Sequence, residues 1–113
     1  VKKTPLSDFS RPRSIGIWAI ELDDGDRLVD VAITDGSRDV LLFASNGKAV
    51  RFAEDEVRAV GRTARGVRGI TLGEEARVVS MIVADVGDIL TATERGYGKR
   101  TPLDDYPRKG RGT

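Results

Sequence analysis

The stretch VLLFASNGKAVRF, residues 40–52, decides the fold. Two short apolar runs, 40–44 and 49–52, lie on either side of the turn sequence SNGK at 45–48. An Asn-Gly pair between two apolar runs is the strongest short-range signal for a β-hairpin, because both central residues of a type I′ turn need a positive φ. The stretch therefore predicts two antiparallel strands joined by a tight turn.

A similar hairpin pattern returns at residues 89–101, as part of a repeat of about fifty residues. The segment TPLSDF at 4–9 returns as TPLDDY at 101–106, displaced by 97 residues, and RFAEDEV at 51–57 is a looser copy between them. Three further matches have displacements of 50, 50 and 49 residues: 16–22 with 66–72, 27–33 with 77–83, and 39–42 with 88–91. Matches in one order at nearly one spacing indicate a little over two copies of one unit.

Each unit is predicted to hold four short strands. They are residues 15–22, 28–34, 40–44 and 49–52 in the first unit, and 67–72, 78–83, 89–93 and 99–101 in the second. The 13 glycines break any long helix, and 54–60 is the one plausible helical turn. Four strands in about fifty residues are typical of a propeller blade, which shares its core with its neighbours. We therefore expect an all-β, propeller-like repeat fold of about two four-stranded blades, with repeats at 1–47 and 48–96 and the start of a third at 97–113.

The composition excludes several kinds of chemistry. The chain has no cysteine and no histidine, so it lacks disulfides, thiolate nucleophiles and the commonest general base and metal ligand. The acidic cluster at 23–26 lacks the spacing of an EF-hand loop, and those at 54–56 and 104–105 have no histidine beside them. We interpret all three as solvated turns and expect no catalytic residue, no metal and no cofactor.

The hydropathy pattern gives no sign of a membrane protein. The chain has no run of about 18 apolar residues, which a transmembrane helix needs. The N-terminal VKKTP has no apolar segment behind it. We therefore expect neither a membrane span nor a signal peptide.

The net charge of +1 hides a sorting of charge along the chain. Three blocks, 1–13, 48–68 and 95–111, hold sixteen Lys/Arg and six acids, whereas the remainder holds three Arg and twelve acids. The blocks occupy equivalent places in the repeats, where a connection enters a strand. In a stack of blades, equivalent positions fall on one rim. The sequence therefore predicts a curved basic track.

We expect this track to bind duplex DNA. Each neutralised phosphate releases condensed counterions, and the planar arginine fork can hold a phosphate through two hydrogen bonds. Glycines between the arginines would let backbone N–H groups approach the phosphates. No Asn/Gln/Arg cluster on a helix is present to read base edges, so binding should be independent of sequence. The predicted DNA-binding residues are Lys2, Lys3, Arg11, Arg13, Lys48, Arg51, Arg58, Arg62, Arg65, Arg68, Lys99, Arg100, Arg108, Lys109 and Arg111.

The same features allow other interpretations. The charged loops could simply be solvated, or the rim or an exposed strand edge could bind a partner protein with no role for DNA. Three basic blocks in register, segregated from the acids, favour DNA. Trp18 could stack on a base, but we expect it to be a partly buried core anchor. Phe43 and Phe52 are predicted to lie in the core.

Several motifs resemble one known family. GRTARGVRGI at 61–70 and GYGKRTPL at 96–103 resemble the C-terminal domain of the A subunit of DNA gyrase, and the first fits gyrase better than its topoisomerase IV paralogue. ITDG at 33–36 and NGKAVRF at 46–52 resemble the blade repeats of that family. The resemblance covers essentially the whole chain. It implies a β-pinwheel, a propeller-like disc of about six blades that exchange strands and wrap DNA around a basic outer rim in support of supercoiling. The chain would be about two blades of that disc.

Two departures from the family pattern limit the expected activity. The family's signature box, of Gln-Arg-Arg-Gly-Gly-Lys-Gly type, is absent, and residues 61–66 are only a degenerate echo of it. The family's catalytic tyrosine follows an arginine in a separate N-terminal domain, whereas Tyr97 follows a glycine and Tyr106 follows an aspartate. We therefore expect no enzyme activity of this chain by itself, but a part in an ATP-hydrolysing type II topoisomerase.

The resemblance also implies partners and a location. The partners would be double-stranded DNA, the remainder of the gyrase A subunit and, through it, the B subunit, in the bacterial cytoplasm at the nucleoid. Two blades leave both ends of a stack open, and exposed strand edges pair with other chains. We therefore expect the isolated chain to self-associate through its open blade edges.

Overall fold

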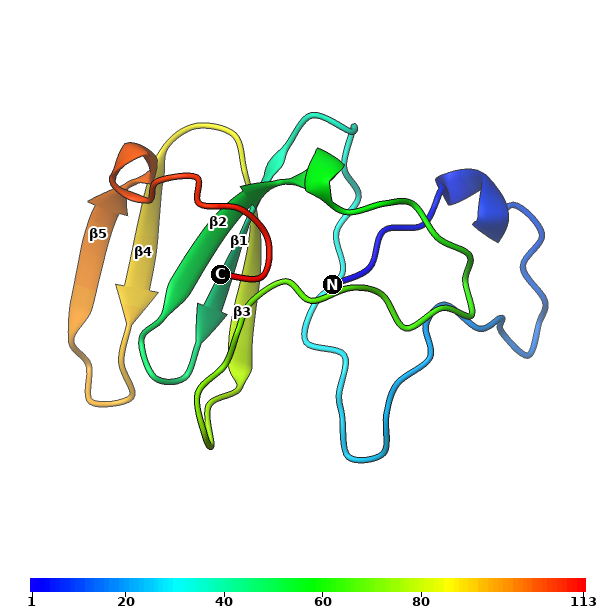
Figure 1. Ribbon diagram of the computed structural model, residues 1–113, viewed down its shortest axis with the longest axis horizontal. Coiled ribbons are helices and arrows are strands. Elements are labelled where there is room, and N and C mark those ends of the chain that lie inside the picture. Colours follow the sequence, from blue (N-terminus) through cyan, green and yellow to red (C-terminus); the bar gives the residue numbers. More distant parts are fainter.

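The computed structural model describes all residues, 1–113, and confirms the all-β prediction (Figure 1). Three short 3₁₀ turns are the only helical elements: η1 (Leu6–Phe9), η2 (Glu54–Glu56) and η3 (Leu103–Asp105). The strands are β1 (Asp39–Ala44), β2 (Ala49–Ala53), β3 (Val78–Ala84), β4 (Asp88–Ala92) and β5 (Gly98–Pro102). None of the helical turns is long or apolar enough to cross a bilayer.

The hairpin predicted from residues 40–52 is present as β1 and β2, but its turn is of another type. The Ala44 amide donates to the Lys48 carbonyl at 2.8 Å, so the loop has three residues. Only Gly47 has a positive φ, of 87°, and Asn46 does not. Because a three-residue loop combines a type I turn with one left-handed residue, one glycine is enough.

The three-stranded sheet combines strands of two sequence repeats. Its order is β2-β1-β3, with every neighbour antiparallel. In β1, Leu41 lies opposite Arg51 of β2 on one side and Ile82 of β3 on the other. β3 belongs to the second predicted repeat, whereas β1 belongs to the first. The periodicity fixes the length of a unit but not where it begins, so the boundaries at 47/48 and 96/97 remain a prediction.

β4 and β5 form a second hairpin that repeats the first. They pair with each other and with no third strand. The Thr93 amide donates to the Tyr97 carbonyl at 2.8 Å, and this bond lies 49 residues after the bond from Ala44 to Lys48. The hairpins are therefore equivalent parts of successive repeats.

Three predicted strands are wrong, namely residues 15–22, 28–34 and 67–72, which have no strand in the structure. The observed sheets accordingly have three and two strands rather than four. The apolar side chains at 28–33 are largely exposed, with Val31 at 71% and Ile33 at 77%. Trp18 is 69% exposed, so its predicted role as a core anchor is also wrong. A strand needs a partner for its backbone groups, and residues 15–22 and 28–34 pair with no neighbouring strand. In residues 67–72, the Val67 amide and the Gly69 carbonyl bond to Val1 and Gly112, which belong to no strand.

Two small apolar clusters lie on either side of the three-stranded sheet. One contains Phe52, which is fully buried as predicted, with Leu42 and Val50 around it. The other contains fully buried Leu41, packed with Ile89 and Leu103 of the following hairpin. Phe43 is half-buried and meets Tyr106 edge-to-face at 5.8 Å. The second cluster shows that consecutive repeats share a core, as the blade interpretation predicts.

We predict that Leu41→Ala lowers the free energy of unfolding by about 2 to 4 kcal/mol, because it leaves a cavity between two repeats. Leu90 is the equivalent residue 49 positions later and is 74% exposed. Leu90→Ala is the matched control and should change stability by less than about 0.5 kcal/mol. Urea denaturation of both variants measures the difference, and equal effects would contradict the assignment of Leu41 to a shared core.

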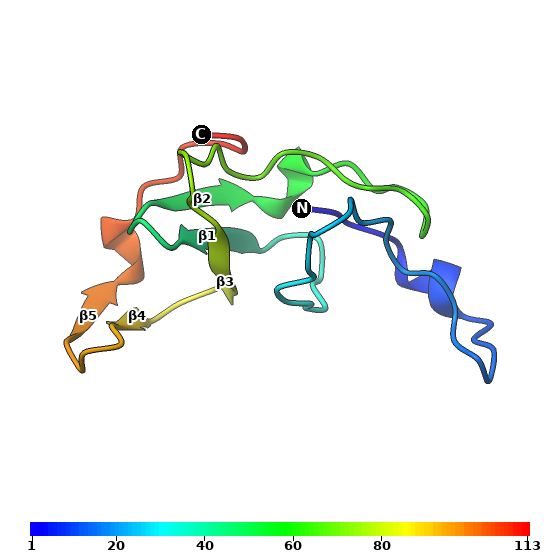
Figure 2. The ribbon, with the colours of Figure 1, turned by 90° about the horizontal axis from the view of Figure 1, so that it is seen from below.

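The molecule is an arch of 43 × 31 × 25 Å (Figure 2). The β4–β5 hairpin lies at one end of the arch, and the segment around η1 lies at the other. Residues 57–72 and 107–113, drawn in green and red, run along the convex side. The fold thus places the two arginine-rich connections on one outer face.

Candidate nucleic-acid interface

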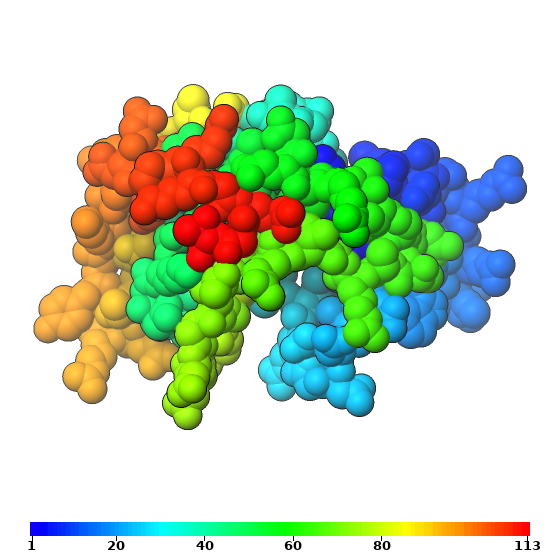
Figure 3. Space-filling model, viewed as in Figure 1, coloured from blue at the N-terminus to red at the C-terminus, as the bar shows by residue number.

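The arginine-rich connections 58–70 and 108–113 adjoin on the convex side, and we call them together the basic ribbon. The Gly112 amide donates to the Gly69 carbonyl at 2.7 Å, and the Thr71 hydroxyl donates to the Gly112 carbonyl at 2.6 Å. In the space-filling view these green and red segments cross the same face (Figure 3). The repeat therefore brings together basic residues that are some forty positions apart in the sequence.

The N-terminal residues support the ribbon. The Val67 amide donates to the Val1 carbonyl at 2.8 Å, and the Val60 amide donates to the Lys3 carbonyl at 2.9 Å. Lys2 donates its Nζ to the carbonyls of Ala19 and Arg62. Partial burial, and then the nearby Arg62, lower the pKa of Lys2, as expected where positive charges are held close together.

Two of the interleaved glycines have a packing role. A Cβ on Gly66 would lie 2.3 Å from the Val1 carbonyl oxygen, and Gly66 has a φ of +102°. A Cβ on Gly69 would lie 2.6 Å from Cδ1 of Leu42. These glycines permit close approach of two protein segments. The structure thus gives them a reason to be glycine that does not involve phosphate.

Several predicted DNA-binding residues join one repeat to the next. Lys3 donates to the Glu54 carbonyl at 3.1 Å, and Arg51 donates to the Leu103 carbonyl at 3.1 Å. Each acceptor is the first residue of the 3₁₀ turn in the next repeat, because Glu54 begins η2 and Leu103 begins η3. The two bonds are therefore the same contact in successive repeats.

A second contact of this kind repeats on the ribbon itself. Arg62 donates to the Trp18 carbonyl at 2.8 Å, and Arg111 donates to the Arg68 carbonyl at 2.7 Å. Lys48 reaches the ribbon from the β1–β2 turn and donates to the carbonyl of Thr71 at 2.6 Å. Because carbonyls carry no net charge, these cations are fixed in position but keep their positive charge.

Arg51 and Arg108 are partly neutralised by one buried acid, Asp39. The Asp39 side chain is only 6% exposed and accepts from Arg51 Nε at 2.7 Å and from Arg108 Nη2 at 2.6 Å. Burial alone would raise the pKa of Asp39, but the hydrogen bonds from Arg108 and Arg51 outweigh it and hold this pKa below its usual value. Arg51 is 17% exposed and therefore belongs to the interior rather than to an accessible surface.

Two further predicted DNA-binding residues, Arg65 and Arg100, are paired with acidic side chains at the surface. Arg65 pairs with Glu21 at 3.1 Å and with Asp23 at 2.6 Å, and the pKa of its guanidinium is raised by these acids. Arg100 on β5 pairs with Asp88 at 3.2 Å. Their contribution to a positive surface is reduced, although exposed pairs of this kind are weak.

Six predicted residues are exposed, and their side chains make no hydrogen bond or ion pair with the protein: Arg11, Arg13, Arg58, Arg68, Lys99 and Lys109. Three of them, Arg58, Arg68 and Lys109, lie on the basic ribbon. They flank Arg62 and Arg111, whose only side-chain partners are carbonyls. The ribbon therefore presents five charges that no acidic side chain pairs with.

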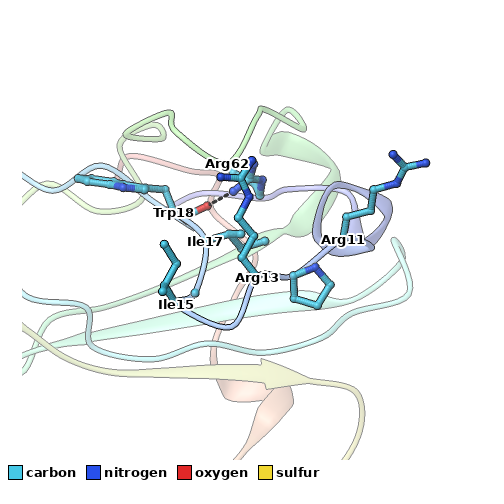
Figure 4. Close-up of a pocket in the computed structure, with 8 residues that line it drawn as sticks. Arg11, Arg13, Ile15, Ile17, Trp18 and Arg62 are labelled. Carbon is cyan, nitrogen blue, oxygen red and sulfur yellow. Dashed lines mark hydrogen bonds between the residues drawn. The ribbon is translucent and has the colours of Figure 1, made fainter.

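Arg11 and Arg13 lie beyond the ribbon, around a broad hollow of about 990 Å³ (Figure 4). Ile15 and Trp18 also line the hollow, and Arg62 enters it from the ribbon. In Figure 4, Arg11 extends away from the other labelled side chains. Lys99 lies on β5 at the opposite end of the arch. The structure thus does not unite all fifteen predicted residues in one surface.

The charge pattern of the sequence did not identify Asp39 as the partner of Arg51 and Arg108. The available signal was the recurrence of Asp39 as Asp88, each at the start of a strand and each twelve residues before a basic residue. No group of three or more acidic side chains is close enough to hold a metal ion.

Comparison with known proteins agrees with the architecture. The family model described as "DNA gyrase C-terminal domain, beta-propeller" matches residues 1–35, 38–85 and 87–113. The three-stranded sheet lies within the second matched segment, and the β4–β5 hairpin lies within the third.

Proteins similar to this chain are A subunits of DNA gyrase. The chain is 58% identical over 113 residues to that of Pseudomonas aeruginosa, covering 99% of the chain and 12% of that protein. It is 59% identical over 114 residues to that of Salmonella typhimurium, covering all of the chain and 13% of that protein. The chain thus spans about an eighth of the length of these relatives.

Two solved structures are similar to the whole fold. One is the C-terminal domain of DNA topoisomerase IV, with a TM-score of 0.92 and 35% identity over 98% of this chain and 35% of that domain. The other is the DNA gyrase A C-terminal domain, with a TM-score of 0.82 and 28% identity over 94% of this chain and 35% of that one. With the family model and the relatives, these matches show that the chain belongs to the DNA gyrase C-terminal domain family of β-propeller domains.

Proposed function

We propose that this chain binds duplex DNA along the basic ribbon, without sequence preference, as part of a DNA-wrapping domain. The observation that carries the proposal is the set of five ribbon cations without an acidic partner, Arg58, Arg62, Arg68, Lys109 and Arg111. The two connections that carry them run along the convex side of the arch (Figure 2). A convex basic surface can contact a duplex that bends around it.

The proposal also concerns the role of the chain within a whole DNA gyrase. The chain would serve the supercoiling reaction of DNA gyrase, an ATP-hydrolysing type II topoisomerase whose catalytic tyrosine lies in another domain. Its partners would be DNA, the rest of the A subunit and, through it, the B subunit. The location would be the bacterial cytoplasm, at the nucleoid.

The residues within the proposed interface have different tasks. Arg58, Arg68 and Lys109 are free to move onto phosphates. Arg62 and Arg111 are already held by carbonyls, so they offer a fixed charge at low entropic cost. Arg51 and Arg108 stabilise the repeat junction through Asp39, and the interface does not depend on them.

The test is fluorescence anisotropy of the chain with a labelled duplex of about 40 base pairs across a salt series. If each of the five ribbon cations contacts one phosphate, affinity should fall by about 500-fold between 50 and 200 mM salt. Duplexes of different sequence but equal length should bind alike. Absence of binding at low salt, or binding that salt does not weaken, would refute the proposal and favour a protein ligand.

A further inference from the structure

The exposed side chain of Trp18 is a feature that the basic ribbon alone does not explain. Trp18 is 69% exposed, and Ile15, which lines the same hollow, is 90% exposed. Exposed apolar surface is unfavourable in water, and tryptophan is among the side chains that contribute most where a protein binds a partner. The two residues therefore indicate a surface that another molecule covers.

Trp18 occupies the place that Arg68 has in the next repeat. The two residues belong to matching segments that are displaced by 50 positions. Each comes two positions after a glycine with a positive φ, which is 86° at Gly16 and 102° at Gly66. The backbone conformation before the two side chains is therefore alike.

The place of Arg68 faces solvent although other segments adjoin it on both sides. The Val67 amide donates to the Val1 carbonyl at 2.8 Å, and Arg111 donates to the Arg68 carbonyl at 2.7 Å. Arg68 is exposed nevertheless. The exposure of Trp18 therefore follows from its place on the outer face of the repeat and does not require that a neighbouring segment be missing.

The surroundings of Trp18 are basic. Arg11, Arg13 and Arg62 line the hollow beside it, and no acidic residue does (Figure 4). Arg62, a ribbon cation, donates to the Trp18 carbonyl at 2.8 Å, so the backbone of Trp18 is fixed next to the ribbon. Phosphates are attracted to such a set of cations, and no carboxylate in the lining competes with them. The hollow therefore suits a polyanion that also offers apolar surface.

We propose that Trp18 contacts the duplex DNA bound by the ribbon, by packing against deoxyribose rings and the wall of a groove. The arginines around the hollow would hold the phosphates on either side. Burial of the indole ring would add affinity without reading the bases. This inference rests on the proposed function, and it adds a contact of a different physical kind to the same interface.

An apolar contact and a phosphate contact differ in their response to salt. Burial of apolar area releases no counterions, so Trp18 should raise affinity without changing the slope of log affinity against log salt. Trp18→Ala should therefore weaken DNA binding by about 10- to 30-fold at every salt concentration. Trp18→Arg, which copies the second repeat, should instead steepen the slope by about 1.

The intrinsic fluorescence of the chain reports directly on the proposed contact. Trp18 is the only tryptophan, so the emission comes from this one indole ring. Titration with an unlabelled duplex should quench and shift the emission, because the ring leaves water and meets the DNA. The midpoint of this change should equal the midpoint from fluorescence anisotropy under the same conditions.

Tyr97 provides a matched control. It is an aromatic residue in the β4–β5 turn, away from the ribbon, and is 76% exposed. Tyr97→Ala should bind DNA like the wild type and should show the same quenching of Trp18. Circular dichroism checks that each variant has kept its fold.

The outcomes separate this inference from the proposed function. An emission that stays constant while anisotropy reports binding, equal affinities of Trp18→Ala and the wild type, or an unchanged salt slope in Trp18→Arg would each overturn the contact at Trp18 and leave binding by the ribbon intact. Equal losses in Trp18→Ala and Tyr97→Ala would also overturn it. Absence of binding in the anisotropy titration would refute the proposed function together with this contact.

Discussion

Asp39→Ala is expected to lower the free energy of unfolding by about 3 to 5 kcal/mol, which is a large part of the stability of a small domain. The Asp39 carboxylate is buried and holds two guanidinium groups, one of them on 17% exposed Arg51. Its removal would leave that charge in the interior without a counter-charge, and would release Arg108 of the next repeat. Urea denaturation followed by circular dichroism measures the loss.

The chain contains its own matched control for this substitution. Asp88 occupies the same place one repeat later and pairs with Arg100, but the two side chains are 40% and 78% exposed. Asp88→Ala should therefore cost about 0 to 1 kcal/mol. We call Asp39, Arg51 and Arg108 together the Asp39 triad. If both substitutions destabilise the chain equally, the large effect cannot come from the burial of this triad.

The Asp39 triad also predicts how stability responds to acid. A folded-state pKa held below the ordinary Asp value of about 3.9 contributes stability that is present above that value. The contribution is lost as the pH falls through the lower pKa of the folded state. The wild type and Asp39→Ala should therefore converge in stability at low pH. Thermal unfolding at a series of pH values measures this, and a difference that persists at the acid end would contradict the electrostatic explanation.

Local patterns predicted the hairpins well, because their strands pair with close neighbours in sequence. The Asn46-Gly47 turn and the repeat at 49 residues are sufficient to place both β1–β2 and β4–β5. Only the turn type differed, since the sequence does not reveal whether two or three residues form the loop. The repeat also implied that equivalent contacts recur, as the bonds from Lys3 and Arg51 to the next turn show.

Strands that depend on a neighbouring repeat could not be predicted in the same way. Residues 28–34 and 78–83 have similar apolar patterns, yet only the second forms a strand, because only it has β1 beside it. The pattern shows that a segment can form a strand, but the pairing partner decides whether it does.

The same limit applies to the candidate interface. The spacing of basic residues predicted that the connections would share one outer face, and residues 58–70 and 108–113 do adjoin there. It could not show which cations are free, because Asp39, Glu21 and Asp23 come from distant parts of the chain. Pairing with an acid separates Arg51 and Arg65 from Arg58 and Arg68, although all four belong to one basic block.

The triple variant Arg58→Ala, Arg68→Ala, Lys109→Ala is expected to lose most of its affinity for duplex DNA. These three side chains are exposed on the ribbon and make no hydrogen bond or ion pair with the protein, so the fold does not depend on them. If each neutralises one phosphate, the slope of log affinity against log salt should become shallower by about 3. Fluorescence anisotropy across the salt series measures both the affinity and the slope.

A control variant separates position from net charge. Arg27, Arg77 and Arg95 are exposed, their side chains make no bond within the protein, and they lie outside the ribbon. The triple substitution of these arginines by alanine changes the net charge equally, so it should keep most of the affinity and a slope close to that of the wild type. If the two triple variants weaken binding alike, the chain attracts DNA through its overall charge, and the ribbon is not the interface. A selective loss in the ribbon variant would instead mean that Arg58, Arg68 and Lys109 hold phosphates on the ribbon, beside Arg62 and Arg111, whose side chains are fixed by carbonyls.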